Sequence, residues 1–181
     1  SYRAHEMYTD VAAKLDGKYK QGIITATWNL TDDVTLKSIS AYQDYNQLMV
    51  IDSDGSAAAP FRGPTTSVSD TQTLTQELNL NARFFDQRLT SIFGVFYFDD
   101  DASIATDLTI FSTGSLRFST VQDAESYAFF TDQTFAVTPR TRLIAGVRFN
   151  HDEKSALQSF FIDRANNTTV TGLPPTTTKI S

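Results

Sequence analysis

The stretch Ser126–Ser155, SYAFFTDQTFAVTPRTRLIAGVRFNHDEKS, decides the fold class. In its second half the odd-numbered positions from Leu143 to Phe149 are apolar, whereas the even-numbered positions from Arg142 to Asn150 are mainly polar or glycine. Successive side chains of a β-strand point to opposite faces, so this pattern predicts a strand with one apolar face. A helix would scatter the same residues around its surface. The intervening Thr138-Pro139-Arg140 indicates a turn, and the whole stretch therefore reads as an antiparallel hairpin.

The same alternation recurs in earlier parts of the chain. Between Thr71 and Ala82 the even positions are mainly apolar and the odd positions are wholly polar, and Ile24 to Leu30 repeats the pattern. Phe, Tyr and Thr, which suit strands, are abundant. The sequence thus predicts an all-β antiparallel meander of six long strands, near residues 18–30, 34–51, 69–82, 88–100, 121–137 and 141–152.

The connections between these strands alternate between short and long. The breaks at 31–33, 83–87 and 138–140 are short, whereas those at 52–68 and 101–120, and the tail from 153, are long and polar. In an antiparallel meander this places all short turns on one rim and all long loops on the other. Transmembrane β-barrels of the outer membrane have this asymmetry. A soluble β-sandwich explains the alternation equally well but explains the one-sided loops poorly.

Two segments break the alternation. Between Val34 and Tyr45, Leu36 and Ile39 lie on opposite parities, and from Ile92 to Phe98 both faces are apolar. Either a β-bulge or packing of the inner face against an internal domain accounts for such a pattern.

Composition excludes several classes of protein. The 181 residues are 40% hydrophobic, carry a net charge of −6 and include no cysteine. A nucleic-acid-binding protein needs a basic surface, and a disulfide scaffold or Cys-ligated metal site needs cysteines. The longest apolar run, Phe93–Phe98, is far too short for a membrane-spanning helix. The first residues lack the features of a signal peptide.

The residues that bear catalytic or metal chemistry do not form a recognisable motif. His5 and His151 are far apart, and no Gly-x-Ser-x-Gly elbow accompanies them. Asp52 and Asp54 resemble the start of a calcium loop but lack its remaining ligands, and Asp99–Asp101 reads as a charged end of a strand. We therefore expect neither an enzyme nor a bound cofactor or metal.

Three stretches resemble the barrel of TonB-dependent outer-membrane receptors. The first is the hairpin of Ser126–Ser155, with its Thr-led turn and its RL…AG.R strand. The second is Thr75–Asp101, in which Gln-Glu-Leu leads into a turn and a Gly-aromatic strand, and the third is Gly22–Tyr45. Together these stretches cover most of residues 18–155.

The resemblance implies a barrel of about 22 strands with a plugged lumen. Six strands cannot close such a barrel, so residues 1–181 are expected to be an internal part of the barrel domain, with the plug domain and the other strands absent. The implied function is active uptake of a scarce solute across the bacterial outer membrane, most often a ferric siderophore or related iron complex, with cobalamin or oligosaccharides as alternatives. The implied partners are outer-membrane lipid, the receptor's own plug domain and the TonB energy-coupling complex, with no nucleic acid. A passive porin-like barrel and a soluble sandwich binding or adhesion module remain alternatives.

Candidate site residues follow from the strand faces and the loops. Glu77, Arg142 and Arg148 lie opposite the apolar sets, so in a barrel they would face the lumen and the plug, and in a sandwich they would face solvent. Phe61 and Arg62 are candidates for ligand contact in an extracellular loop, although an ordinary loop position explains them as well.

Overall fold

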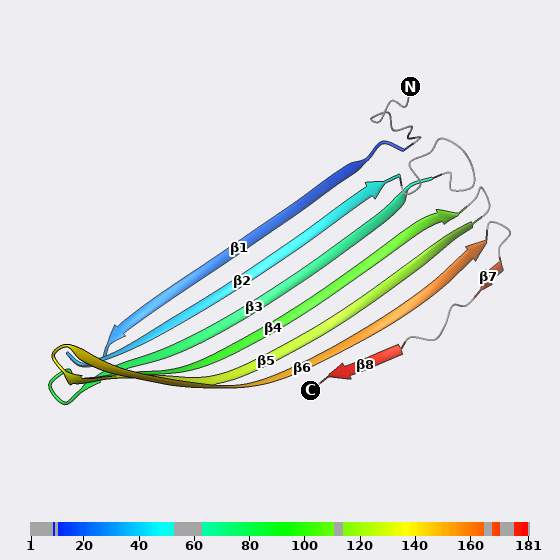
Figure 1. Ribbon diagram of the computed structural model, residues 1–181. Coiled ribbons are helices and arrows are strands. Elements are labelled where there is room, and N and C mark those ends of the chain that lie inside the picture. The colour runs from blue at the N-terminus through cyan, green and yellow to red at the C-terminus, as the bar shows by residue number, and fades with distance from the viewer. Residues whose placement is uncertain are drawn as a thin grey trace, which may run out of the picture.

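Every regular element in the described part of the chain is a β-strand. The computed structural model describes residues 9, 11–52, 63–110, 114–164, 168–170 and 176–180, and within them eight strands form one antiparallel sheet. Strands β1 to β6 follow one another in chain order across the sheet, and β7 and β8 both pair with β6 (Figure 1). Their bounds are β1 Lys14–Asn29, β2 Val34–Ile51, β3 Thr65–Phe84, β4 Leu89–Ile110, β5 Gly114–Thr138, β6 Thr141–Arg164, β7 Thr168–Val170 and β8 Thr176–Ile180.

The six predicted strands are confirmed in order and pairing, but several are longer than expected. The segment 101–120, expected as a loop, continues β4 and β5, and its residues pair from Asp101↔Asp123 to Ile110↔Gly114. Likewise β3 begins at Thr65, and β6 continues to Arg164. Polar composition suggested loops there, yet Thr suits strands, and pairing across the hairpin stabilises strands whose side chains are polar.

The register across the main strands is continuous. The pairings β1–β2, β2–β3 and β3–β4 run without a shift, and so does β4–β5. The single irregularity in the described pairings lies between Ala136 and Thr138, beside the β5–β6 turn. A bulge therefore does not explain the mixed segments at 34–45 and 92–98. Ile39 and Phe96 instead lie on the face opposite Leu36 and Phe93.

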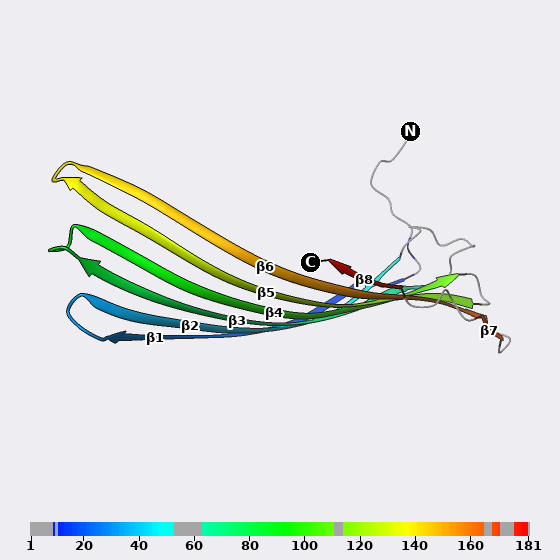
Figure 2. The same cartoon turned by 90° about the horizontal axis from the view of Figure 1, so that it is seen from below.

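The three short turns lie together at one rim of the sheet. The turns at 30–33, 85–88 and 139–140 each join the two strands of a hairpin at the same end of the sheet, and the other ends of strands β2 to β5 lie at the opposite rim (Figure 2). This confirms the expected separation of short turns from the remaining connections. In the β3–β4 turn Phe85, Asp86 and Gln87 all have positive φ, a conformation that fits the twist of tight hairpins.

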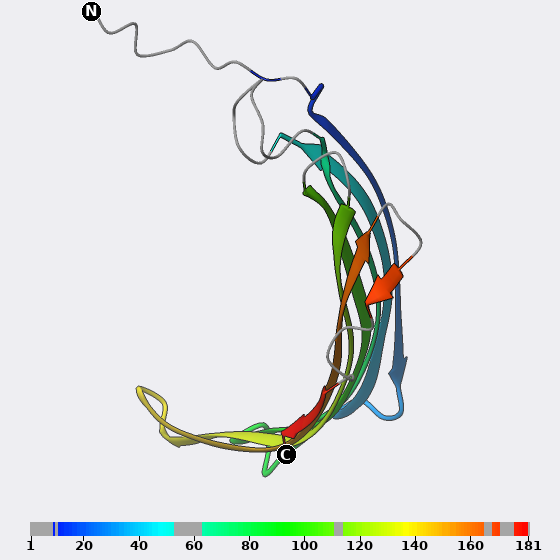
Figure 3. The ribbon, with the colours of Figure 1, turned by 90° about the vertical axis from the view of Figure 1, so that its right-hand side faces the viewer.

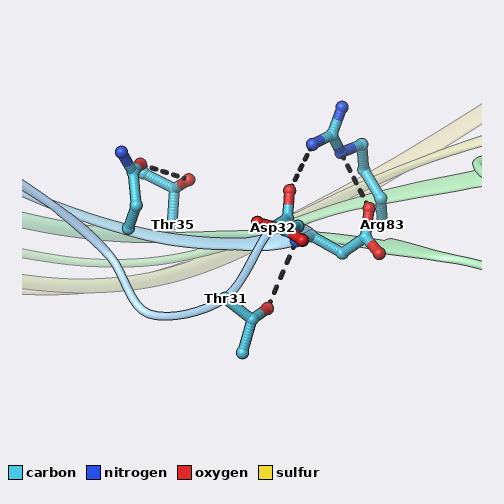
Figure 4. Close-up of polar contacts among 6 residues, drawn as sticks. Thr31, Asp32, Thr35 and Arg83 are labelled. Carbon is cyan, nitrogen blue, oxygen red and sulfur yellow. Dashed lines mark hydrogen bonds and ion pairs between the residues drawn. The ribbon is translucent and has the colours of Figure 1, made fainter.

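Side chains fasten the first turn to the neighbouring hairpin. The Arg83 Nη2 donates to the Asp32 carbonyl oxygen at 2.6 Å, and its Nε lies 3.4 Å from the Asp33 carboxylate (Figure 4). Within the turn the backbone N–H of Asp33 donates to Thr31 Oγ1 at 3.2 Å, and Thr35 Oγ1 donates to the Asn29 side chain at 3.2 Å. The turn rim is thus held by contacts between hairpins as well as within them.

The sheet is a single curved layer. Seen along the strands it forms an open arc, with β1 at one end and the lower part of β6 at the other (Figure 3). All strands of the described residues belong to this one sheet, so the two-layered sandwich alternative is wrong for this chain. An open arc of six long strands that does not close on itself has the geometry of a wall segment of a larger barrel.

Candidate functional site

Each long strand divides into two parts with different surfaces. We call the part next to the short turns the lower segment and the part beyond it the upper segment. The lower segment comprises residues 22–29, 34–42, 74–84, 89–97, 127–138 and 141–151, and the upper segment comprises 14–21, 43–51, 65–73, 98–110, 114–126 and 152–164.

One face of the lower segment is a broad apolar band. Cross-strand pairs place Leu78 beside Val95, Val95 beside Phe129, and Phe129 beside Phe149. These side chains are solvent-exposed, from 38% for Leu78 to 66% for Phe149. Such an apolar surface on one layer of strands requires an apolar surrounding. We call this face, in both segments, the outer face.

Polar side chains within the band bond to one another. Ser91 pairs with Gln133, which also donates to Thr131 at 2.7 Å. Gln76 bonds to Ser40 and donates to Ser38 Oγ at 3.0 Å. Polar groups in hydrocarbon must find partners within the protein, and these residues do so on the band itself.

A row of tyrosines and a belt of charges end the band. Tyr97 and Tyr127 pair across β4 and β5, with ring centroids 5.1 Å apart. From Leu89 to Tyr97 the band spans nine residues of β4, the length of a tilted membrane strand. The charged belt begins at the next outward residues of these strands and contains Lys20, Asp44, Asp99, Asp101, Asp123, Glu125 and Glu153.

Carboxylates stand opposite one another within this belt. Asp101 pairs with Asp123 across β4 and β5. Loss of surrounding water and a hydrogen bond with Asp123 raise the pKa of the Asp101 carboxyl. Nearer the tip of the same hairpin, Arg117 donates to the Asp107 carboxylate at 2.6 and 2.9 Å and lowers the pKa of that carboxyl. The upper outer face is therefore a solvated, charged surface.

The opposite face of the lower segment, the inner face, carries the charged residues singled out in the sequence. Glu77 and Arg148 both project there, since neither shares a face with the apolar band. Glu77 accepts a hydrogen bond from Asn79 Nδ2 at 2.5 Å. The Arg148 guanidinium lies over the rings of Phe96 and Phe130, 5.6 and 5.4 Å from their centroids, and donates to Asn150 at 2.7 Å.

The third candidate, Arg142, lies on this face two residues into β6, and the structure does not bring it together with Glu77 or Arg148. Phe61 and Arg62 lie outside the described residues. His151 lies within β6 on the outer face, exposed, and its Nε2 is 3.4 Å from the Glu153 carboxylate.

Sequence reasoning missed the inner face of the upper segment. Alternation continues there, for example at Ala102, Ile104, Thr106 and Leu108 on β4, although the Thr and Ser content of this segment is typical of loops. The pattern that indicates a strand is the alternation around Arg117: Leu116 and Phe118 lie on the inner face and Arg117 lies on the outer face.

No group of His, Asp or Glu side chains in the described part of the chain is arranged to hold a metal ion. Nor do the described residues contain a helix long and apolar enough to cross a membrane.

A known protein family matches this chain over nearly its whole length. The family model described as TonB dependent receptor-like, beta-barrel matches residues 4–179. Among solved structures, the ferric yersiniabactin uptake receptor FyuA of Yersinia pestis superposes with a TM-score of 0.70 at 18% identity, over 93% of this chain and 24% of that one. The siderophore receptor PiuA of Acinetobacter baumannii matches with a TM-score of 0.40 at 12% identity, over 83% of this chain and 32% of that one. No curated protein matches the sequence. The chain thus spans about a quarter of the length of the FyuA structure, and that likeness concerns the fold.

Proposed function

The chain belongs to the TonB-dependent receptor-like β-barrel family, and on this premise we propose that it forms part of the wall of an outer-membrane receptor that imports a ferric siderophore or related iron complex. Members of this family are transport receptors of the bacterial outer membrane. In this proposal residues 1–181 contribute six wall strands to a larger barrel. The remaining strands complete the wall, and a plug domain in its lumen blocks free diffusion.

The observation that carries the proposal is the division of the outer face. An apolar band of nine residues on β4, a tyrosine row and a charged belt follow one another along the strands. A strand that passes from the lipid tails through the interface into water is expected to carry these three surfaces in this order. The lower segment accordingly crosses the bilayer, the short turns face the periplasm, and the upper segment extends into the medium.

The inner face of the lower segment supports a plugged lumen. Glu77, Arg142 and Arg148 project to this side, where charge is tolerated and where a plug can pair with it. Arg148 retains a charged edge beside Asn150 for such a contact. Energy coupling then requires the TonB complex to remodel the plug from the periplasm.

The placement of the wall is tested by labelling cysteine variants of the intact receptor in outer membranes. A lipid-confined thiol reagent should react at position 147 and not at position 148, since these neighbours lie on the outer and inner faces. Equal labelling at both positions would contradict the orientation.

The direction of the chain is tested with epitope tags. A tag beside Gly114 should be detected on unpermeabilised cells, and a tag after Asp32 should not be detected, because these positions lie at opposite rims. The reverse pattern would invert the topology.

Transport is tested by iron uptake from ferric siderophores in cells that lack other receptors for them. We expect uptake to require both the receptor and a functional TonB complex. Uptake that continues unchanged without TonB would instead identify a passive barrel.

A further inference from the structure

Six stretches of the upper segment carry no charged side chain on their inner face. We call the inward-facing side chains of residues 15–19, 45–51, 65–71, 102–108, 116–122 and 156–162 the upper inner wall. Every charged residue in these ranges projects to the outer face, and these are Asp16, Lys18, Asp70, Asp107 and Arg117. Neighbouring positions on a strand point to opposite faces. The restriction of charge to the outer face therefore indicates that the two faces of the upper segment meet different surroundings.

The upper inner wall combines apolar and aromatic side chains with hydroxyl groups. The rings of Phe118 and Phe160 lie 4.9 Å apart, and those of Tyr19 and Tyr45 lie 6.5 Å apart. Ile104 and Phe118 are 44% and 45% exposed, so the sheet itself leaves them accessible. Between the aromatic pairs, Ser, Thr and Gln side chains of β3, β4 and β5 supply neutral hydrogen-bonding groups.

The nearest inward charges lie at the base of this wall. They are Asp100, Asp152 and Lys154, of which Asp100 accepts a hydrogen bond from Thr73 at 2.6 Å. Two carboxylates and one ammonium leave an excess of negative charge. An anionic solute on this wall would therefore lose its hydration and face this net negative charge at the base, which is unfavourable.

We infer that the upper inner wall receives an electrically neutral solute with an apolar body and neutral hydrogen-bonding edges. This inference rests on the proposed function and specifies its substrate class: a neutral iron chelate rather than a polyanionic one. Aromatic side chains supply contact area at low entropic cost, and the hydroxyl groups fix orientation. Charge stays on the outer face, where water solvates it.

The test is equilibrium binding to the intact receptor of two probes, a neutral iron(III) trihydroxamate complex and a trianionic iron(III) tris-catecholate complex. We expect the neutral complex to bind at least about tenfold more tightly. Tighter binding of the trianion would overturn the inference while leaving the proposed iron uptake intact. Binding of neither complex would count against the proposed function itself.

A charge placed on the wall sharpens this test. Thr120→Arg puts a cation on the inner face, and Ser119→Arg, one residue away, puts the same cation on the outer face. Thr120→Arg should increase the affinity for the trianionic complex by about tenfold, whereas Ser119→Arg should leave it unchanged. Equal effects of the two variants, or no effect of Thr120→Arg, would show that the solute does not contact this wall.

Two phenylalanines give the matching apolar test. Phe118 lies on the inner face and Phe161 on the outer face, with similar exposures of 45% and 41%. Phe118→Ala should lower the affinity for the neutral complex by about tenfold, and Phe161→Ala should not change it. Unchanged binding by Phe118→Ala would contradict the inference.

Discussion

The lower and upper segments are built from the same six strands, yet their faces are reversed in polarity. In the lower segment the outer face is apolar and the inner face carries Glu77, Arg142 and Arg148. In the upper segment most charges lie outside, and the upper inner wall above Asp100, Asp152 and Lys154 is uncharged. The pleat fixes only that neighbouring residues face opposite ways. In the proposed placement, which face is apolar follows from the surroundings: lipid outside the lower segment, and water outside the upper segment.

The comparison also explains why the strands are so long. A membrane needs only about 9–11 residues of a tilted strand. β4 and β5 contain 22 and 25 residues, so the hairpin between them extends well beyond the tyrosine row. Backbone pairing continues to the end of this extension, so its residues belong to the same sheet as the lower segment.

The largest expected difference between the segments is the cost of a lysine on the outer face. Val147→Lys places a charge in the apolar band and should lower the free energy of unfolding from lipid vesicles by about 2–4 kcal/mol. Val121→Lys places it on the outer face of the upper segment, in water, and should change stability by less than about 0.5 kcal/mol. Equal costs would mean that the two segments share one environment. The measurement is reversible urea unfolding of the intact receptor in vesicles.

The next effect concerns packing on the inner face of the lower segment. A Cβ atom at Gly94 would lie only 2.0 Å from the Phe130 ring, which in turn lies under Arg148. Gly94→Ala should therefore displace Phe130 and cost about 1–3 kcal/mol in the same unfolding experiment.

The control for this variant is Gly22→Ala on the outer face, where nothing lies within 4 Å of the added carbon. Its effect should stay within about 0.5 kcal/mol. A similar cost for both glycines would assign the effect to backbone conformation rather than to the packing of Phe130.

A smaller effect should follow from replacing the guanidinium between the two inner rings. Arg148→Lys keeps the charge but loses the flat contact with Phe96 and Phe130, and should cost about 0.5–1 kcal/mol. The double variant with Phe96→Ala should show non-additive costs, because both changes remove the same contact. Strict additivity would show that the ring contact contributes nothing.

The smallest effects are pH-dependent and belong to the outer face of the upper segment. Asp107 has a lowered pKa in the folded protein, so its pairing with Arg117 stabilises the hairpin above the ordinary aspartate range and is lost as the pH falls through the lowered pKa. Asp101 has a raised pKa, so its carboxylate destabilises the hairpin at higher pH, and protonation relieves this cost as the pH falls through the raised pKa.

Hydrogen exchange of the segment 99–125 in the intact receptor measures both effects. Mild acidification should increase protection, and this gain should vanish in Asp101→Asn. Stronger acidification should decrease protection, and this loss should vanish in Asp107→Asn. A response of the same sign in both variants would contradict the assignment.

Much of the architecture could be predicted from the alternation of residue types. The parity of Leu143 to Phe149 indicated a strand with one apolar face, and the short breaks placed three turns on one rim. Strand ends were harder to predict, because the hairpin around residues 111–113 has the polar composition of a loop. Only partners across the sheet, such as Asp107 for Arg117, extend the strands that far. The lumen-facing role of Glu77, Arg142 and Arg148 stays a prediction.

The sequence by itself determined which residues share a face, since a strand has a period of two whatever surrounds it. It also determined the order of the strands, because short connections join antiparallel neighbours. Only the tertiary structure decided the register, and register brings Tyr97 beside Tyr127, Asp101 beside Asp123, and Phe130 over Gly94. These contacts join residues distant in sequence, and a shift of one position would send every side chain of a strand to the other face. For that reason the tyrosine row, the charged belt and the uncharged inner wall exist only in the assembled sheet.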